Sequence, residues 1–365
     1  MEYILQVFTG GWHTQNYTAE AIIERLGTVA DTIPVKAVLI GWNLNTALYR
    51  AVGEFLHSRH INMILWLPVF SETGELLPSD EALDLNGEPV GSLALQEGEN
   101  FAFSCPVSPR NLHNVQQIYE TYFEDCGFDG VFLDKIRTQS FVGGISGVLS
   151  CGCPGCQNVY AVRGLSLSQV SAAYAEKGDA FLETSGYIPG SGFAFADPLA
   201  EQFFALKGTL IAESITELCR YFHARGLSVG LDLYAPLLSR FVGQSYRAIA
   251  KEADFIKPML YRKTEAPAGI GYEYRLLKQS LPHTQNYPDI ITDDEFLRRQ
   301  LAEFRDLPCK KYPGIEVNYR EDIARTDPAY IRGSMKILEE SGMDGAVLAW
   351  DVMLAPDEHI KAVKE

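Results

Sequence analysis

Eight short apolar runs recur along the chain, and longer segments with helical spacing of apolar residues separate them. The runs cover residues 3–8, 35–40, 61–65, 131–133, 227–231, 255–260, 315–318 and 346–349. Apolar residues follow one another in these runs without regular alternation with polar ones, so neither face of such a strand suits contact with water. This pattern is typical of parallel strands covered on both sides by helices. Eight strands alternating with helices predict an α/β chain that folds as a single (β/α)8 TIM barrel.

The main alternative is a doubly wound open sheet that binds a nucleotide. That fold carries a Gly-x-Gly-x-x-Gly or P-loop sequence after its first strand, and neither follows residues 3–8. We therefore expect one barrel domain over residues 1–365 and no organic cofactor. Two insertions, at about 71–104 and 138–196, follow the third and fourth predicted strands. Long loops in a compact domain commonly act as lids or binding elements.

Composition and charge narrow the possible partners. The chain of 365 residues is 47% hydrophobic, which is sufficient for a large core. Its formal net charge of −16, without basic blocks, argues against a nucleic acid or an anionic membrane as the partner and favours a neutral ligand. The start of the sequence lacks a basic signal region, and no run approaches the roughly 20 apolar residues of a membrane span. These features predict a cytoplasmic protein.

All four tryptophans follow or end a predicted strand, at the expected mouth of the barrel: Trp12, Trp42, Trp66 and Trp350. Tryptophan offers a flat apolar face and one N–H donor, which suits stacking on a sugar ring beside its hydroxyls. The alternative is that these rings only plug the top of the barrel. Polar neighbours at the same ends are further candidate binders of a carbohydrate: His13, Asn43, Arg137, Lys257, Tyr261, Asn318 and Asp351.

Carboxylates also gather at the predicted strand ends. Asp134, Asp232 and Glu316 are candidate catalytic residues, because glycosidic cleavage needs one carboxylic acid to protonate the leaving oxygen and one carboxylate to attack or to activate water. Lys135 and Arg137 follow Asp134 directly, so a salt-bridged strand end is the alternative there. For Asp232 and Asp351 the alternative is helix capping or loop pairing.

Three of the seven cysteines, Cys151, Cys153 and Cys156, lie within six residues, and Cys105 ends the first insertion. Adjacent barrel loops would bring these four thiols together. Four thiolates suit a closed tetrahedral zinc site, which is structural rather than catalytic. The alternative is a set of reduced thiols without a metal.

The order Cys105-Pro-Val-Ser-Pro, helix, strand, Cys151-Gly-Cys153-Pro-Gly-Cys156 resembles the zinc cluster of glycoside hydrolase family 42 β-galactosidases. The segment from Asp129 to Arg137, with Lys257-Pro-Met-Leu-Tyr261, resembles barrel proteins described as glycoside-hydrolase-like. In family 42, an Asn-Glu pair on strand four supplies the acid/base and a glutamate on strand seven is the nucleophile. Here Leu133-Asp134 replaces that pair, and Glu316 falls on the predicted strand seven.

The residues and the resemblance together predict a glycoside hydrolase that acts on a small oligosaccharide or glycoside. The alternative from another class is a barrel that binds carbohydrate without cleaving it, or an inactive relative. A barrel lyase or aldolase with Lys257 as a Schiff base has less support, because nothing in the sequence marks a phosphate site.

Overall fold

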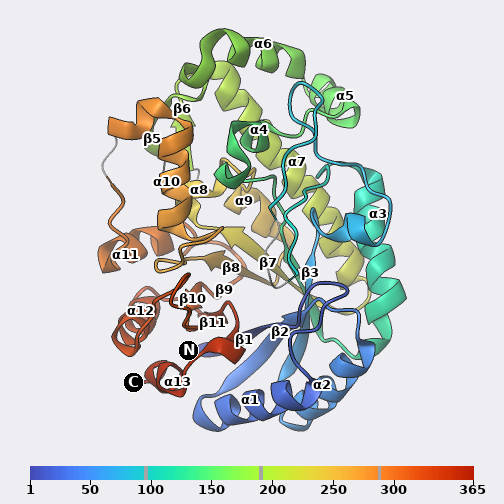
Figure 1. The fold of residues 1–365 in the computed structure, drawn as a ribbon, viewed down its shortest axis with the longest axis vertical. Helices are drawn as coiled ribbons and strands as arrows, with labels where there is room; N and C mark the ends of the chain where they lie inside the picture. The colour runs from blue at the N-terminus through green and yellow to red at the C-terminus, as the bar shows by residue number, and fades with distance from the viewer. Residues whose placement is uncertain (94–97, 189–191, 287–288) are drawn as a thin grey trace.

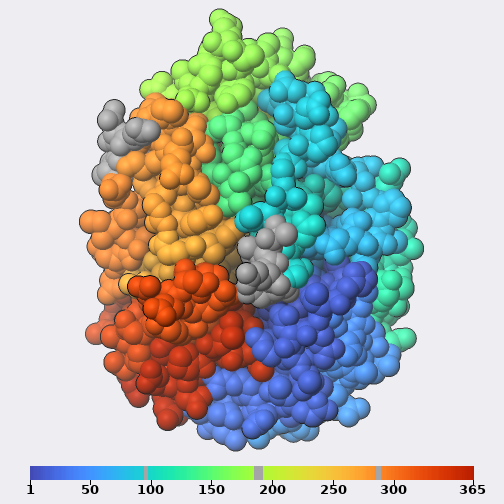
Figure 2. Space-filling view, viewed as in Figure 1, coloured from blue at the N-terminus to red at the C-terminus, as the bar shows by residue number. Residues whose placement is uncertain are grey.

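The computed structural model describes residues 1–93, 98–188, 192–286 and 289–365 (Figure 1). Within them, eight parallel strands close into a barrel, which confirms the predicted fold. In chain order these are β1 (Glu2–Phe8), β2 (Val35–Gly41), β3 (Asn62–Pro68), β4 (Gly130–Asp134), β7 (Ser228–Tyr234), β8 (Phe255–Met259), β10 (Gly314–Glu316) and β11 (Gly345–Ala349). The barrel closes where β1 pairs with β11 and where Gly314 of β10 pairs with Met259 of β8. The blue and red ends of the chain accordingly lie side by side in Figure 2.

Helices cover the outside of the barrel (Figure 1). They include α1 (Ala19–Thr32), α2 (Thr46–Ser58), α3 (Pro109–Ile118), α7 (Pro198–His223), α8 (Pro236–Ser239), α9 (Tyr246–Ile249), α10 (Ile270–Ser280), α11 (Asp294–Ala302), α12 (Pro328–Glu340) and α13 (Asp357–Ala362). The start of α3 follows from its sequence, because the Ser108 side chain accepts a hydrogen bond from Asn111 N and Pro109 occupies the first turn. Among the described residues, every helix is too short or too polar to cross a membrane.

Both predicted insertions extend from the carboxyl ends of their strands. The segment between β3 and α3 is held mainly by isolated bridges, among them Ser71 with Phe103 and Glu81 with Ser104. The segment after β4 contains α4 (Gly144–Leu149), α5 (Pro154–Val162), α6 (Leu167–Lys177) and the hairpin of β5 (Thr184–Ile188) with β6 (Gly192–Phe195). Residues 94–97 of the first insertion and 189–191 of the second lie outside the described residues.

Candidate active site

A cavity of about 950 Å³, part of it open to solvent, lies at the carboxyl ends of the barrel strands. The strands contribute Gln6 and Phe8 (β1), Trp66 (β3), Asp134 (β4), Asp232 (β7), and Lys257 and Met259 (β8). Loops contribute Glu99, Phe101, Lys135, Arg137, Tyr261, Thr264, residues 266–268, Arg320, Ile323 and Trp350. The site is therefore built by almost every strand end and by the first insertion.

Asp134 is the last residue of β4, and its carboxylate is oriented by two N–H donors. Trp66 Nε1, on the neighbouring strand β3, donates to Asp134 Oδ2 at 2.9 Å. The backbone N–H of Lys135 donates to Oδ1. Lys135 has a φ of +53°, so the chain turns sharply after the strand, in the left-handed region that a non-glycine residue seldom adopts. The carboxylate therefore keeps one fixed direction at the cavity wall.

The ammonium of Lys135 pairs with two glutamates of the first insertion rather than with Asp134. Its Nζ donates to Glu72 Oε1 and lies 3.1 Å from Glu99 Oε1. It also lies over the rings of Trp42 and Phe101, at 5.0 and 4.1 Å from their centroids. Burial raises the pKa of Glu99, against the attraction of Lys135. This ion cluster of Glu72, Lys135 and Glu99 holds the first insertion against the end of β4.

Asp232, on the strand next to Asp134, lies at the base of the same cavity. Its Oδ2 accepts a hydrogen bond from Lys257 Nζ at 3.0 Å, and both side chains are almost completely buried. Burial raises the pKa of Asp232 to about 7, and the nearby charge of Asp134 adds to the rise, although Lys257 opposes it. A Cβ on Gly314 would approach Lys257 Cε at 2.7 Å, so glycine at that position leaves room for the lysine.

Two buried oxygens in the cavity lining have no hydrogen-bond partner among the described residues, Asp232 Oδ1 and Gln6 Oε1. Buried polar atoms in proteins are nearly always paired, so these acceptors are available to a ligand or to water. Gln6 was missed by the sequence analysis. The signal was present, because it is a polar residue inside the apolar run of β1.

The structure separates the four tryptophans into two pairs. Trp66 and Trp350 line the cavity. Trp42 is fully buried, 5.2 Å from the ring of Trp66, and Trp12 donates from Nε1 to the backbone oxygen of Glu72 at 2.9 Å. Trp12 and Trp42 therefore pack beneath the site, as the plugging alternative describes.

Glu316 is not among the described residues that line the cavity, in contrast to the sequence-based expectation. Its Oε1 accepts hydrogen bonds from Lys263 N at 2.7 Å and from both the N–H and the hydroxyl of Thr264 at 3.1 Å. Its Oε2 accepts from the hydroxyl of Tyr330 on α12. The side chain thus bonds to α12 and anchors the loop after β8, from which Thr264 reaches the cavity.

Four further predicted binders also lie outside the described lining. His13 is exposed, and Asn43 holds the loop after β1 through Nδ2 contacts with backbone oxygens of Gly11 and Thr14. Asn318 Oδ1 accepts from Trp350 N at 3.2 Å. Asp351 accepts from the hydroxyl of Tyr17 at 2.9 Å, and burial raises its pKa to about 7. Arg137, Lys257 and Tyr261 do line the cavity, and the Arg137 guanidinium lies over the rings of Phe103 and Tyr234.

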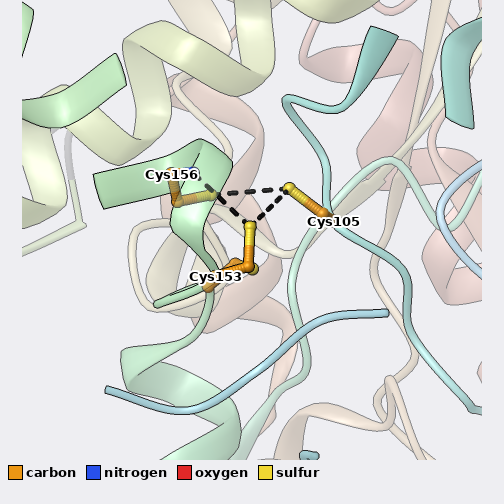
Figure 3. Close-up of side chains that lie close together, drawn as sticks. Cys105, Cys153 and Cys156 are labelled. Atoms are coloured by element: carbon orange, nitrogen blue, oxygen red, sulfur yellow. Dashed lines mark hydrogen bonds between the residues drawn. The ribbon is translucent and has the colours of Figure 1, made fainter. Parts of the chain in front are cut away.

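The four predicted cysteines come together away from this cavity. Their sulfur atoms all lie within 4.8 Å of one another, and all four residues are buried. Cys105 Sγ lies 3.5 Å from Sγ of both Cys153 and Cys156 (Figure 3). Four converging thiols form a donor set that a soft metal ion prefers. The cluster joins the end of the first insertion to the second.

No model of a known protein family matches the chain, and no curated protein sequence does. Solved structures do resemble it. The glycoside hydrolase domain of PgaB (BpsB) from Bordetella bronchiseptica is 17% identical with a TM-score of 0.63, over 99% of this chain and 98% of that one. α-L-Fucosidase isoenzyme 2 from Paenibacillus thiaminolyticus is 12% identical with a TM-score of 0.57, over 99% of this chain and 48% of that one. A class V chitinase from Pseudomonas fluorescens Pf-5 is 10% identical with a TM-score of 0.53, over 99% and 98%. At these identities the similarity establishes the barrel fold.

Proposed function

We propose that the chain is a glycoside hydrolase whose catalytic carboxyl groups are Asp134 and Asp232. The observation that carries this proposal is their placement on adjacent strands, where Leu133 pairs with Leu231, facing one cavity in different environments. Asp134 accepts two N–H hydrogen bonds, whereas the pKa of Asp232 is raised to about 7. Acid-assisted glycosidic cleavage needs one protonated and one ionised carboxyl group, and different environments for the two groups produce that combination. The glycoside hydrolases among the structural neighbours add support for the reaction class.

In the proposed reaction, protonated Asp232 gives its proton to the glycosidic oxygen as the bond from that oxygen to the anomeric carbon breaks. Asp134 either attacks the anomeric carbon, and water that has lost a proton to the Asp232 carboxylate then hydrolyses the resulting glycosyl ester, or it removes a proton from the water that attacks that carbon directly. Lys257 then stabilises the carboxylate that Asp232 becomes, because its Nζ already lies 3.0 Å from Oδ2. Trp66, Trp350 and Tyr261 provide apolar faces for the sugar, and Gln6 Oε1 provides an acceptor for one hydroxyl. Glu316 is assigned a positioning role through Thr264.

We further propose that Cys105, Cys151, Cys153 and Cys156 bind a structural zinc ion. The donor set supports this assignment, since four buried thiols lie within 4.8 Å of one another. The family 42 resemblance of the same cysteines agrees with it. Bound zinc would stabilise the two insertions against each other and would have no open position for substrate. All proposed chemistry therefore remains with the carboxyl groups.

The test is hydrolysis of a panel of aryl glycosides by the wild-type chain and by three variants. We expect turnover by the wild type and losses of roughly 10²- to 10⁴-fold for Asp134→Asn and Asp232→Asn. Glu316→Gln serves as the matched control and should lose less, because it keeps one acceptor oxygen for the loop. Full activity of Asp134→Asn would overturn the site assignment. Sugar binding without turnover of any glycoside would favour the non-catalytic alternative, and borohydride trapping on Lys257 would favour Schiff-base chemistry.

A further inference from the structure

A second cavity shares a wall with the candidate active site, and a third cavity shares a wall with the second. The second, of about 620 Å³, shares Phe101, Arg137 and Pro267 with the main cavity. The third, of about 880 Å³, shares Ser92 and Phe103 with the second. Each of these volumes includes space open to solvent. The three spaces therefore follow one another from the barrel centre along the first insertion.

The third cavity contains buried hydroxyl groups that the protein does not satisfy. Thr73 is 0% exposed and Ser104 is 5% exposed, and both line this cavity. Neither Thr73 Oγ1 nor Ser104 Oγ has a hydrogen-bond partner among the described residues. Since buried hydroxyls are generally paired, these two groups indicate a polar occupant. Neither residue belongs to the catalytic machinery proposed above.

Charge restricts the occupant of the third cavity. Its lining includes Glu75 and Glu81 as well as Glu72, whose carboxylate pairs with Lys135, and none of its described lining residues is a lysine, arginine or histidine. A uronic acid or a sulfated sugar would be repelled there, because like charges at short distance are unfavourable. Neutral sugar hydroxyls can instead donate to the carboxylates and exchange hydrogen bonds with Thr73 and Ser104.

Aromatic side chains lie where the cavities meet. Phe101 stands between the first and second cavities, and Phe103 between the second and third. Arg137, which lines the first two, is fixed by its position 4.8 Å from the ring centroid of Phe103. Apolar ring faces beside hydrogen-bonding groups suit successive sugar rings, whose C–H faces are apolar and whose edges carry hydroxyls.

We propose that the three cavities form one elongated cleft, which binds a neutral oligosaccharide of at least three sugar units. The third cavity is then a binding subsite distant from the bond that is cleaved. The identity of the ligand as a carbohydrate rests on the proposed function. The preferred substrate is accordingly a chain of sugars rather than a simple glycoside.

The test measures binding by calorimetry to the Asp134→Asn variant, which separates affinity from turnover. The probes are cello-oligosaccharides and chito-oligosaccharides of one to six units and an oligogalacturonide of four units. We expect affinity to rise with length to at least three units in one neutral series, and the acidic probe to bind at least tenfold more weakly. Equal affinity for all lengths above one unit would overturn the proposal, as would preference for the acidic probe.

Two substitutions assign the effect to the third cavity. Thr73→Val with Ser104→Ala removes both unpaired hydroxyls and should weaken binding of the longest oligomers about threefold to tenfold, while the disaccharide is unaffected. Thr209→Val, at an exposed position on α7, is the matched control. Unchanged affinity for the longest oligomers, in variants with wild-type melting temperatures, would overturn the subsite. Length-dependent binding without hydrolysis by the wild type would support the cleft while contradicting the hydrolase proposal.

Discussion

The indole N–H of Trp66 donates a 2.9 Å hydrogen bond to Oδ2 of Asp134, across the pairing of β3 with β4. This bond orients a carboxylate at the mouth of the barrel from the neighbouring strand. Trp66 also lines the cavity. One residue can therefore offer an apolar ring to the proposed sugar and also hold the carboxylate of Asp134.

Trp66→Phe should therefore impair catalysis more than sugar binding. Phenylalanine keeps an apolar ring but removes the donor, and a hydrogen bond to a charged group contributes about 1.5–3 kcal/mol. We expect kcat to fall about tenfold to a hundredfold while KM changes less, measured on the best aryl glycoside. Trp350→Phe, which changes the other tryptophan of the lining, is the control and should mainly raise KM. Equal losses of kcat in both variants would contradict a specific role for the Trp66 donor.

The activity should decline as pH rises through about 7. Asp232 carries the proton in the proposed mechanism, and burial raises its pKa to about 7, so the competent acid form is present below that pH and lost above it. A pH profile of kcat/KM should show this alkaline limb for the wild type and its absence in the residual activity of Asp232→Asn. If both proteins show the alkaline decline of kcat/KM at the same pH, the decline arises from the titration of a group other than Asp232.

Lys135→Met should strongly destabilise the fold. The Lys135, Glu72 and Glu99 side chains are 3%, 1% and 21% exposed, and removal of the lysine leaves one buried and one partly buried carboxyl group without their cation. Breaking a buried pair in this way typically costs about 3–5 kcal/mol in the free energy of unfolding, measured by urea denaturation. Adding Glu72→Gln should restore part of the loss.

The matched control for that variant is Lys177→Met, which removes a lysine that is 47% exposed and pairs with Asp197, the N-cap residue of α7. Its expected cost is about 0–1 kcal/mol. Similar destabilisation by both substitutions would mean that the ion cluster contributes no more than a surface pair.

Cys153→Ser should remove the metal and loosen the insertions while the barrel stays folded. We expect about one equivalent of zinc in wild-type protein never exposed to chelator, and faster proteolysis within residues 138–196 of the variant. Binding of long oligosaccharides should weaken as well, because Ser104 of the third cavity directly precedes Cys105. Cys309→Ser, outside the cluster, should keep the metal. Wild-type protein with less than about a tenth of an equivalent of zinc would rule the site out.

The fold could be predicted because parallel strands covered by helices have a simple signature. The apolar run at residues 131–133 lies within β4, every residue of which is buried, and the spacing of Leu48, Val52 and Leu56 marks the inner face of α2. The residues at which the strands end were predicted less exactly. β3 continues to Pro68, so Trp66 is a strand residue instead of the first residue of an exit loop.

The residues of the site could be predicted only where the carboxyl end of a strand is enough to place a side chain in the cavity. Asp134, Asp232 and Lys257 reach the cavity from consecutive strands of the barrel. Glu316 does not, because its carboxylate oxygens are occupied by the backbone N–H groups of Lys263 and Thr264 and by the hydroxyl of Tyr330 on α12. Glu72 and Glu99 belong to an irregular insertion, whose sequence has no periodicity from which a direction could be read.

The cysteine cluster also bears on how the molecule assembles. Cys105 and Cys153 are 48 residues apart, and the chain between them includes α3 and β4. Closing a loop of this length is entropically unfavourable until the intervening elements have packed. We expect the four thiols to meet only after β4 has docked beside β3. Binding of a metal ion would then be a late step in folding. The rate of metal binding would report when the strands of this half of the barrel have paired.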